Sequence, residues 1–318
     1  MDVGSYLPLF VPLLAVPLML ASAPRLRPAL ASWLTAIACV VLTAGMAISL
    51  GLFTVAGLAG LSTVADLGHL SMPTLDRAGI TDLPVDATAA ALLIAGCAAG
   101  AIAAARRGAA LARAYSLAAE SAAADVLLVL PDARPIAHAL PGRPGRIVVS
   151  TGILAGLNPA ERRALLAHER AHLIRSHHLF VAVVDVFATA NPLLLPLRKV
   201  VRYTTERWAD ELAARAVGSR SVVARAVGKA ALATEDAVHR DPVRLGATAG
   251  DVPRRVAALL IAPPARRLLT SRSVFALVAI GLTVASAAFA VEAAGDLHHV
   301  LALAHLAGVF PGHVDRLR

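Results

Sequence analysis

Four long uncharged apolar runs set the pattern of the chain. Each run contains at least 19 residues, and a helix of that length spans roughly 28 Å, close to the thickness of the hydrocarbon core of a bilayer. Membrane-spanning helices are therefore expected in four places. They are residues 5–23, 29–53, 87–105 and 273–291.

The stretch between the third and fourth runs, residues 108–272, has the mixed polarity of a folded domain. Short apolar segments bounded by Pro or Gly predict three strands, and a helix-forming segment follows them. Asn158 suits the N-cap of that helix, Pro159 its first position and Glu161 a capping box. The expected fold class is an α-helical membrane protein, with four transmembrane helices and an inserted α+β domain. The expected strands are residues 125–130, 135–140 and 146–150.

Residues 179–197 are nearly as apolar as the four runs. Pro192 and Pro196 make this segment a poor simple span. A fifth span would also place two halves of the domain on opposite sides of the membrane. We therefore expect a buried or membrane-grazing hairpin here.

Arginine clusters give the expected orientation of the helices. With four spans, every cluster falls on one side of the membrane and the acidic, irregular loop 66–86 falls on the other. The positive-inside rule places the arginine side in the cytoplasm. We therefore expect a multi-pass cell-membrane protein with its 108–272 domain in the cytoplasm and the short tail 292–318 outside. The clusters are Arg25 and Arg27; Arg106 and Arg107; and Arg266, Arg267 and Arg272.

Composition agrees with a membrane protein that carries a basic domain. Apolar residues make up 58% of the chain, charged residues 16%, and mean hydropathy is +0.70. The net charge is +9, but aromatic residues are only 4% and no nucleic-acid-binding motif is present. The basic excess therefore indicates cytoplasmic loops and contact with anionic lipid rather than direct nucleic-acid binding. The two cysteines, Cys39 and Cys97, both lie in apolar runs, so neither a disulfide framework nor a cysteine metal site is expected.

The candidate chemistry is concentrated in the sequence His168-Glu169-Arg170-Ala171-His172. On a helix, His168 and His172 share a face and can offer two imidazoles to one metal ion. Glu169 lies beside that face, where it can take a proton from a metal-bound water. This is the H-E-x-x-H pattern of zinc metallopeptidases, although a five-residue pattern also occurs by chance.

A candidate third ligand lies on a later helix. Glu206 follows His172 by 34 residues, and Asp210 shares its face four residues further on. A carboxylate from a second helix would complete a His/His/Glu site with one open position, which predicts one Zn²⁺ per chain. Asp210 could then orient one of the histidines.

His178 is a rival third ligand, because it occupies the last position of the pattern H-E-x-x-H-x-x-G-x-x-H. Arg175 stands at the glycine position of that pattern, where the chain must turn sharply. Without a metal role, His177 and His178 are expected at a helix C-terminus, where they would complement the helix dipole.

The second predicted strand is a candidate for substrate binding. Its leading proline, Pro135, suits the edge of a sheet. An edge strand beside a zinc site can take a peptide as an added strand; a strand that only packs against the motif helix is the alternative. The candidate residues are Ile136, Ala137, His138 and Ala139.

The two motifs together resemble the integral-membrane gluzincins, and most closely the peptidase module of the BlaR/MecR beta-lactam sensor-transducers. The similarity runs over residues 125–260 and the four-helix layout. The pair of motifs is shared with the CAAX and heat-shock membrane proteases, so it identifies the clan better than the family. Supporting segments are residues 146–152, 191–192 and 253–256.

The resemblance implies that His168, His172 and Glu206 bind zinc, Glu169 is the general base and Asp210 supports the site. It also implies regulatory cleavage of a protein substrate such as a cytosolic repressor. A quality-control protease and a non-catalytic membrane transducer are the alternatives.

Two features depart from the sensor-transducers. Ala209 replaces their usual cysteine, and no Ser-x-x-Lys follows the fourth run, so direct sensing by an acylated serine is not expected. The tail histidines are expected on a solvated amphipathic segment rather than in a metal site. They are His298, His299, His305 and His313.

Overall fold

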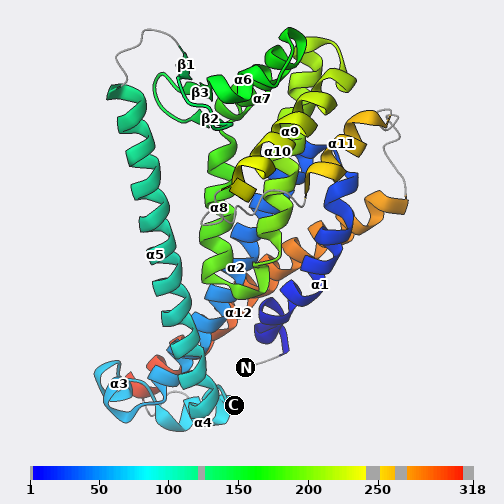
Figure 1. Ribbon diagram of the computed structural model, residues 1–318. Helices are drawn as coiled ribbons and strands as arrows, with labels where there is room; N and C mark the ends of the chain where they lie inside the picture. The colour runs from blue at the N-terminus through cyan, green and yellow to red at the C-terminus, as the bar shows by residue number, and fades with distance from the viewer. Residues whose placement is uncertain (1–2, 121–125, 241–250, 262–270, 311–318) are drawn as a thin grey trace.

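The computed structural model describes residues 3–120, 126–240, 251–261 and 271–310. It is mostly helical and has one small sheet (Figure 1). The helices are α1 Leu7–Ser22, α2 Pro28–Ala59, α3 Ser62–Leu67, α4 Met72–Ala78, α5 Leu83–Glu120, α6 Thr151–Ala155, α7 Pro159–Ile174, α8 His177–Ala190, α9 Leu197–Val217, α10 Arg220–Arg240, α11 Val252–Leu260 and α12 Ser271–Val309. The strands are β1 Leu127–Leu130, β2 Ala137–Leu140 and β3 Arg146–Ser150.

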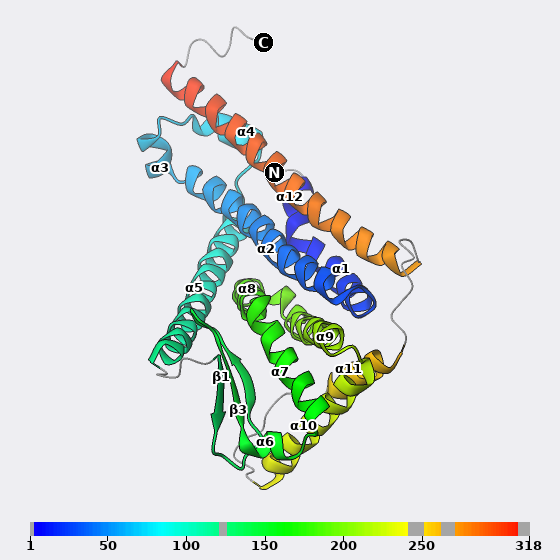
Figure 2. The same cartoon turned by 90° about the horizontal axis from the view of Figure 1, so that it is seen from above.

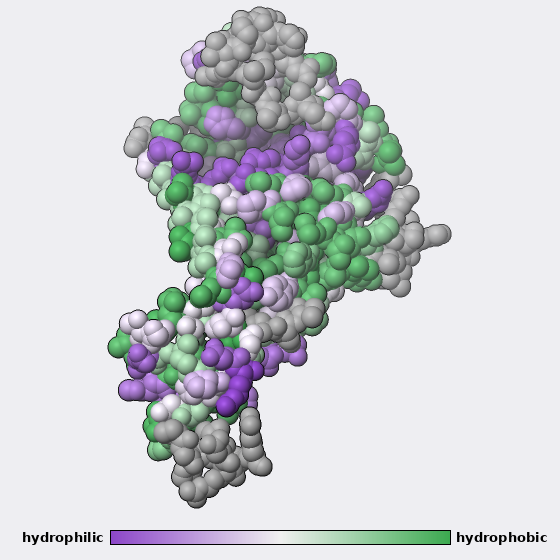
Figure 3. Space-filling view, turned by 90° about the horizontal axis from the view of Figure 1, so that it is seen from below, coloured by the Kyte–Doolittle hydropathy of each residue, from purple (hydrophilic) through white to green (hydrophobic). Residues whose placement is uncertain are grey.

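Four helices of the described chain are long and apolar enough to cross a membrane. They are α1 with its flanking 3-10 turns (Gly4–Arg25), α2, α5 and α12, and each of these four segments contains one of the expected runs. By length and composition alone, α7 and α8 would add a fifth candidate, but they are bent by 56° at their junction. Seen from below, apolar areas and a hydrophilic band lie side by side on the surface (Figure 3).

The segment between α2 and α5 and the length of α12 differ from the expectation. The region expected as an irregular acidic loop contains the short helix α4, and α12 continues to Val309 instead of ending near residue 291. The continuation packs on α4, and the Ser71 amide donates to the Ala304 carbonyl at 2.9 Å. His298, His299 and His305 are exposed on it. Apolar contacts hold the segment against the rest of the molecule. They involve Ala56, Ala59, Leu75, Ile80, Leu297 and Ala304.

The expected histidine-rich tail has a structural role in its described part. His305 Nδ1 lies 2.9 Å from the Gly68 carbonyl. Within the described residues, none of the tail histidines belongs to a group that could hold a metal ion. His313 lies outside the described residues.

The three expected strands form a sheet in the order β1-β3-β2. β3 is buried throughout and pairs in parallel with β1 and antiparallel with β2. β2 is therefore an edge strand, as Pro135 predicted. The sheet lies against α7, and α9 and α10 pack on the other side of that helix (Figure 2).

Residues 179–197 form most of α8, a 3-10 turn at Pro192–Leu194 and the start of α9. α8 packs against both α2 and α5. The contact with α5 is close, because a Cβ at Gly96 would lie 2.8 Å from the Ala190 carbonyl oxygen. α5, which also packs on α2, is thereby joined to the helix that follows the histidine motif.

Candidate active site

The start of α7 is fixed by the expected capping box. The Glu161 amide donates to Asn158 Oδ1 at 2.9 Å, and the Asn158 amide donates to Glu161 Oε2 at 3.0 Å. Both partners satisfy amides that the first helical turn leaves free. The helix then presents His168 and His172 on one face, with their Nε2 atoms 3.1 Å apart.

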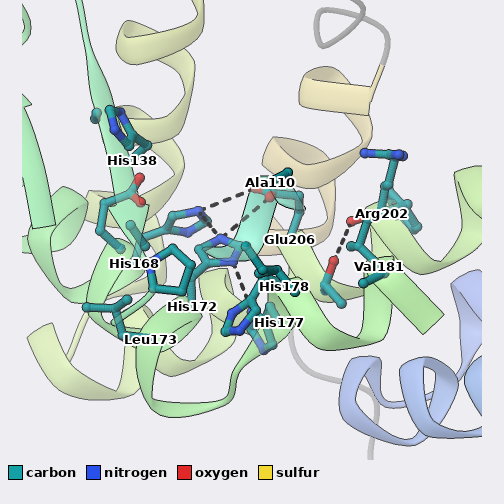
Figure 4. Close-up of a pocket in the computed structure, with 18 of the residues that line it drawn as sticks. Ala110, His138, His168, His172, Leu173, His177, His178, Val181, Arg202 and Glu206 are labelled. Carbon is teal, nitrogen blue, oxygen red and sulfur yellow. Dashed lines mark hydrogen bonds and ion pairs between the residues drawn. The ribbon is translucent and has the colours of Figure 1, made fainter. Parts of the chain in front are cut away.

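Helix α9 brings Glu206 to the two histidines (Figure 4). Glu206 Oε2 lies 3.3 Å from His168 Nε2, and Oε1 lies 3.5 Å from His172 Nε2. Among the described residues, these three form the one group of His, Cys, Asp or Glu side chains that could hold a metal ion.

The spacing of the three residues fits a tetrahedral ion. Bonds of about 2.0–2.2 Å to nitrogen and oxygen place ligand atoms about 3.3–3.6 Å apart. The two imidazole nitrogens are 3.1 Å apart, and Glu206 faces each of them with a different oxygen, at 3.3 and 3.5 Å, so each of these pair distances is close to that range. Two imidazoles and one carboxylate are also the donor set that zinc prefers in hydrolytic sites.

A second layer of contacts orients both histidine rings. Asp210 Oδ1 lies 3.0 Å from His168 Nδ1, and His177 Nδ1 lies 3.1 Å from His172 Nδ1. A histidine that binds a metal through Nε2 carries its proton on Nδ1 and needs an acceptor there. The buried Asp210 and His177 side chains supply those acceptors.

Arg255 of α11 is part of the site although sequence reasoning gave it no role. Its Nε and Nη2 atoms donate to the two oxygens of Asp210 at 2.9 and 2.8 Å. Its Nη1 lies 2.9 Å from Glu206 Oε2. Arg255 therefore holds both the candidate ligand and its supporting acid. The only sequence signal was its place in the segment 253–256.

The charges of the site are arranged around the place where an ion would stand. Burial lowers the pKa of His168, but the hydrogen bonds that its ring donates to the Asp210 and Glu206 carboxylates outweigh burial and raise the pKa overall. Burial raises the pKa of Glu206, yet His168 and Arg255 lower it overall, so this carboxylate is ionised. Burial lowers the pKa of His172 and keeps its ring neutral. A bound cation would replace the positive charge of the His168 proton.

Glu169 lies next to the ligand face and against β2. Burial raises its pKa, and a hydrogen bond with the Ala139 backbone opposes that shift. The Ser150 amide donates to the Ile136 carbonyl at 2.9 Å. Since hydrogen-bonded pairs alternate along an antiparallel ladder, the backbone groups of Ala137 and Ala139 face the free edge.

A cavity of about 600 Å³ lies in front of the site. Its wall is formed by β2 and by residues of α5, α7, α8, α9 and α11. It is large enough for several residues of an extended peptide. Its lining includes Ala137, His138, Ala139, His168, Glu169, His172 and Glu206.

The rival ligand His178 lines the cavity but does not join the ligand group. The expectation that His177 and His178 end a helix is wrong. α7 ends at Ile174, and the two histidines begin α8. A positive φ of 50° at Ser176 provides the turn, so the chain bends after the motif without a glycine at residue 175.

Comparison with known proteins supports this site. Residues 101–191 match the sequence model of Peptidase family M48. The match includes His168, Glu169 and His172 and ends before Glu206. It indicates a metallopeptidase, and members of this family typically depend on zinc. No curated protein and no solved structure matches the chain.

Proposed function

We propose that the chain is a membrane-embedded zinc metalloendopeptidase, with His168, His172 and Glu206 as the metal ligands. The observation that carries this proposal is the convergence of the three side chains, within 4.8 Å of one another, from two helices. The match to Peptidase family M48 supports the same chemistry.

The bound zinc would supply an acidified water and polarise the scissile carbonyl. Glu169 accepts the proton of that water on its carboxylate and passes it to the leaving amine. Its burial at the cavity wall favours this exchange, because a raised pKa lies closer to neutrality. Asp210 and His177 hold the ligand rings in place.

The substrate peptide binds as an added strand on β2. The free edge offers the backbone groups of Ala137 and the Ala139 carbonyl. It lies beside Glu169, whose carboxylate accepts from the Ala139 amide. Main-chain pairing would hold the peptide extended across the cavity. This mode accepts many sequences, so side-chain preference must come from other walls of the cavity.

The arginine distribution supports a cytoplasmic site, and the motifs support a relationship to the BlaR/MecR peptidases. We propose a cytosolic regulatory protein, such as a transcriptional repressor, as the substrate. Cleavage of many unfolded membrane proteins, rather than one repressor, would instead favour a quality-control role.

Metal content of the detergent-purified full-length protein tests this proposal. We expect about one zinc per chain in the wild type, loss of zinc in Glu206→Ala and retention in His178→Ala. His178→Ala is the matched control, because His178 lines the same cavity outside the ligand group. Retention in Glu206→Ala together with loss in His178→Ala would overturn the ligand assignment. Zinc binding without peptide hydrolysis would favour a non-catalytic transducer.

A further inference from the structure

A second charged cluster lies in the wall of the active-site cavity. It is centred on Asp185 of α8, which is 3% exposed. Arg107 of α5 and Arg198 and Arg202 of α9 all contact its carboxylate. Three guanidinium groups against one carboxylate leave this cluster with an excess of positive charge.

The three arginines differ in how many of their N–H groups have hydrogen-bond acceptors. Arg198 Nη2 also donates to the Asp185 carbonyl at 3.0 Å and to Thr189 Oγ1. Arg107 and Arg202, by contrast, reach the Asp185 carboxylate through Nη2 alone. Both contact Oδ2, and Arg202 Nη2 also donates to Oδ1 at 3.3 Å. A guanidinium carries five N–H donors. Within the described residues, the remaining donors of these two side chains have no protein acceptor, and the side chains are 45% and 53% exposed.

Both partly exposed arginines face the substrate space. Arg107 lines the cavity from α5 and Arg202 lines it from α9. Figure 4 shows Arg202 and His138 on opposite sides of Glu206. The cavity therefore has β2 at one side of the ligand group and Arg202 at the other.

We propose that Arg107 and Arg202 form a specificity subsite for an acidic side chain of the peptide substrate. Two guanidiniums that share one oxygen repel each other, and a second carboxylate between them would relieve that repulsion. Arginine suits this task because its planar N–H groups bind carboxylates in pairs. The inference rests on the proposed peptidase function, since it requires a peptide in this cavity.

The test uses full-length, zinc-loaded protein and pairs of unstructured reporter peptides. Each pair carries Glu or Gln at one position, and the position is moved across the cleavage site. We expect the wild type to prefer Glu at one position by about tenfold in kcat/KM. Arg107→Gln and Arg202→Gln should bring that ratio close to one, and Arg202→Glu should shift the preference towards Lys. Arg163→Gln, an exposed change outside the cavity, should keep the Glu preference.

A binding measurement separates this inference from the proposed function. Fluorescence anisotropy of the same peptides with the zinc-loaded Glu169→Gln protein reports on the subsite without turnover. A Glu preference in binding that Arg202→Gln removes supports the subsite even if no peptide is cleaved, in which case the peptidase proposal alone fails. Equal binding of Glu and Gln peptides at every position overturns the inference. So does tighter association with anionic-lipid nanodiscs without any peptide preference, because the arginines would then face headgroups.

Discussion

Two clusters of carboxylates and arginines lie along α9 and differ in which charge is in excess. At the C-terminal part of the helix, Glu206 and Asp210 share one arginine, Arg255, and face two imidazoles. At its N-terminal part, Arg198 and Arg202 belong to a group of three arginines that share Asp185.

The difference indicates what each cluster can bind. Two carboxylates and the lone pairs of two imidazoles leave unused acceptors, which suit a cation. Three guanidiniums around one carboxylate leave unused donors, which suit an anion. A neighbouring pair of such clusters can hold a metal ion and a charged part of the substrate in one cavity.

The largest expected effect is on catalysis without loss of the metal. Glu169→Gln should keep zinc, because Glu169 is outside the ligand group, and should lower kcat by about 10²–10⁴-fold through loss of the general base. Metal analysis and peptide cleavage on the same sample check this. Loss of zinc in Glu169→Gln would place this residue among the ligands instead.

The next effect is on zinc affinity and concerns Arg255, the arginine beside the candidate ligands. Arg255→Met should weaken zinc affinity by about 10–100-fold, because it releases both Glu206 and Asp210. Arg254→Met is the matched control, since Arg254 pairs only with the half-exposed Asp251 among the acidic residues described. Competition with a chromophoric chelator gives both affinities, and equal values would show that Arg255 does not position the ligand.

The arginine cluster should respond differently to loss of its carboxylate. Asp185→Asn should destabilise the protein by about 1–2 kcal/mol, because three arginines lose their shared charge. The same change should strengthen the preference for acidic peptides, since the internal competitor is gone. Thermal unfolding in detergent and the Glu/Gln peptide ratio measure the two effects. A fall in both quantities would mean that Asp185 helps to form the subsite.

Glu161 provides a third buried carboxylate, with a purely structural role. Hydrogen bonds from Lys229 and from the Asn158 backbone lower its pKa. Glu161→Gln should cost about 1 kcal/mol or less at neutral pH, because Lys229 is half exposed and the pair is partly screened. A depressed pKa stabilises the fold above the unfolded-state pKa, and this contribution is lost as pH falls through the folded-state value.

The difference in stability between wild type and Glu161→Gln should therefore disappear in acid. Unfolding midpoints of both proteins across an acid-to-neutral pH series check this, with Arg163→Gln as an exposed neighbour for comparison. A constant difference at all pH values would assign the effect to packing rather than to charge.

The sequence by itself determined the local features of this protein. Uncharged runs gave the four apolar helices, turn residues gave the three strands, and Asn158 with Glu161 gave the start of α7. His168 and His172 could be paired because a helix fixes the spacing of residues four apart. These features depend on neighbours within a few residues, which the sequence shows directly.

Only the tertiary structure decided the contacts between distant segments. It placed Arg255 on Asp210, 45 residues away, and Arg107 on Asp185, 78 residues away. It also continued α12 beyond residue 291 and packed its end onto α4, because that segment buries apolar side chains there. Such pairings depend on how helices cross, and the charge pattern of one segment does not show which opposite charge will meet it.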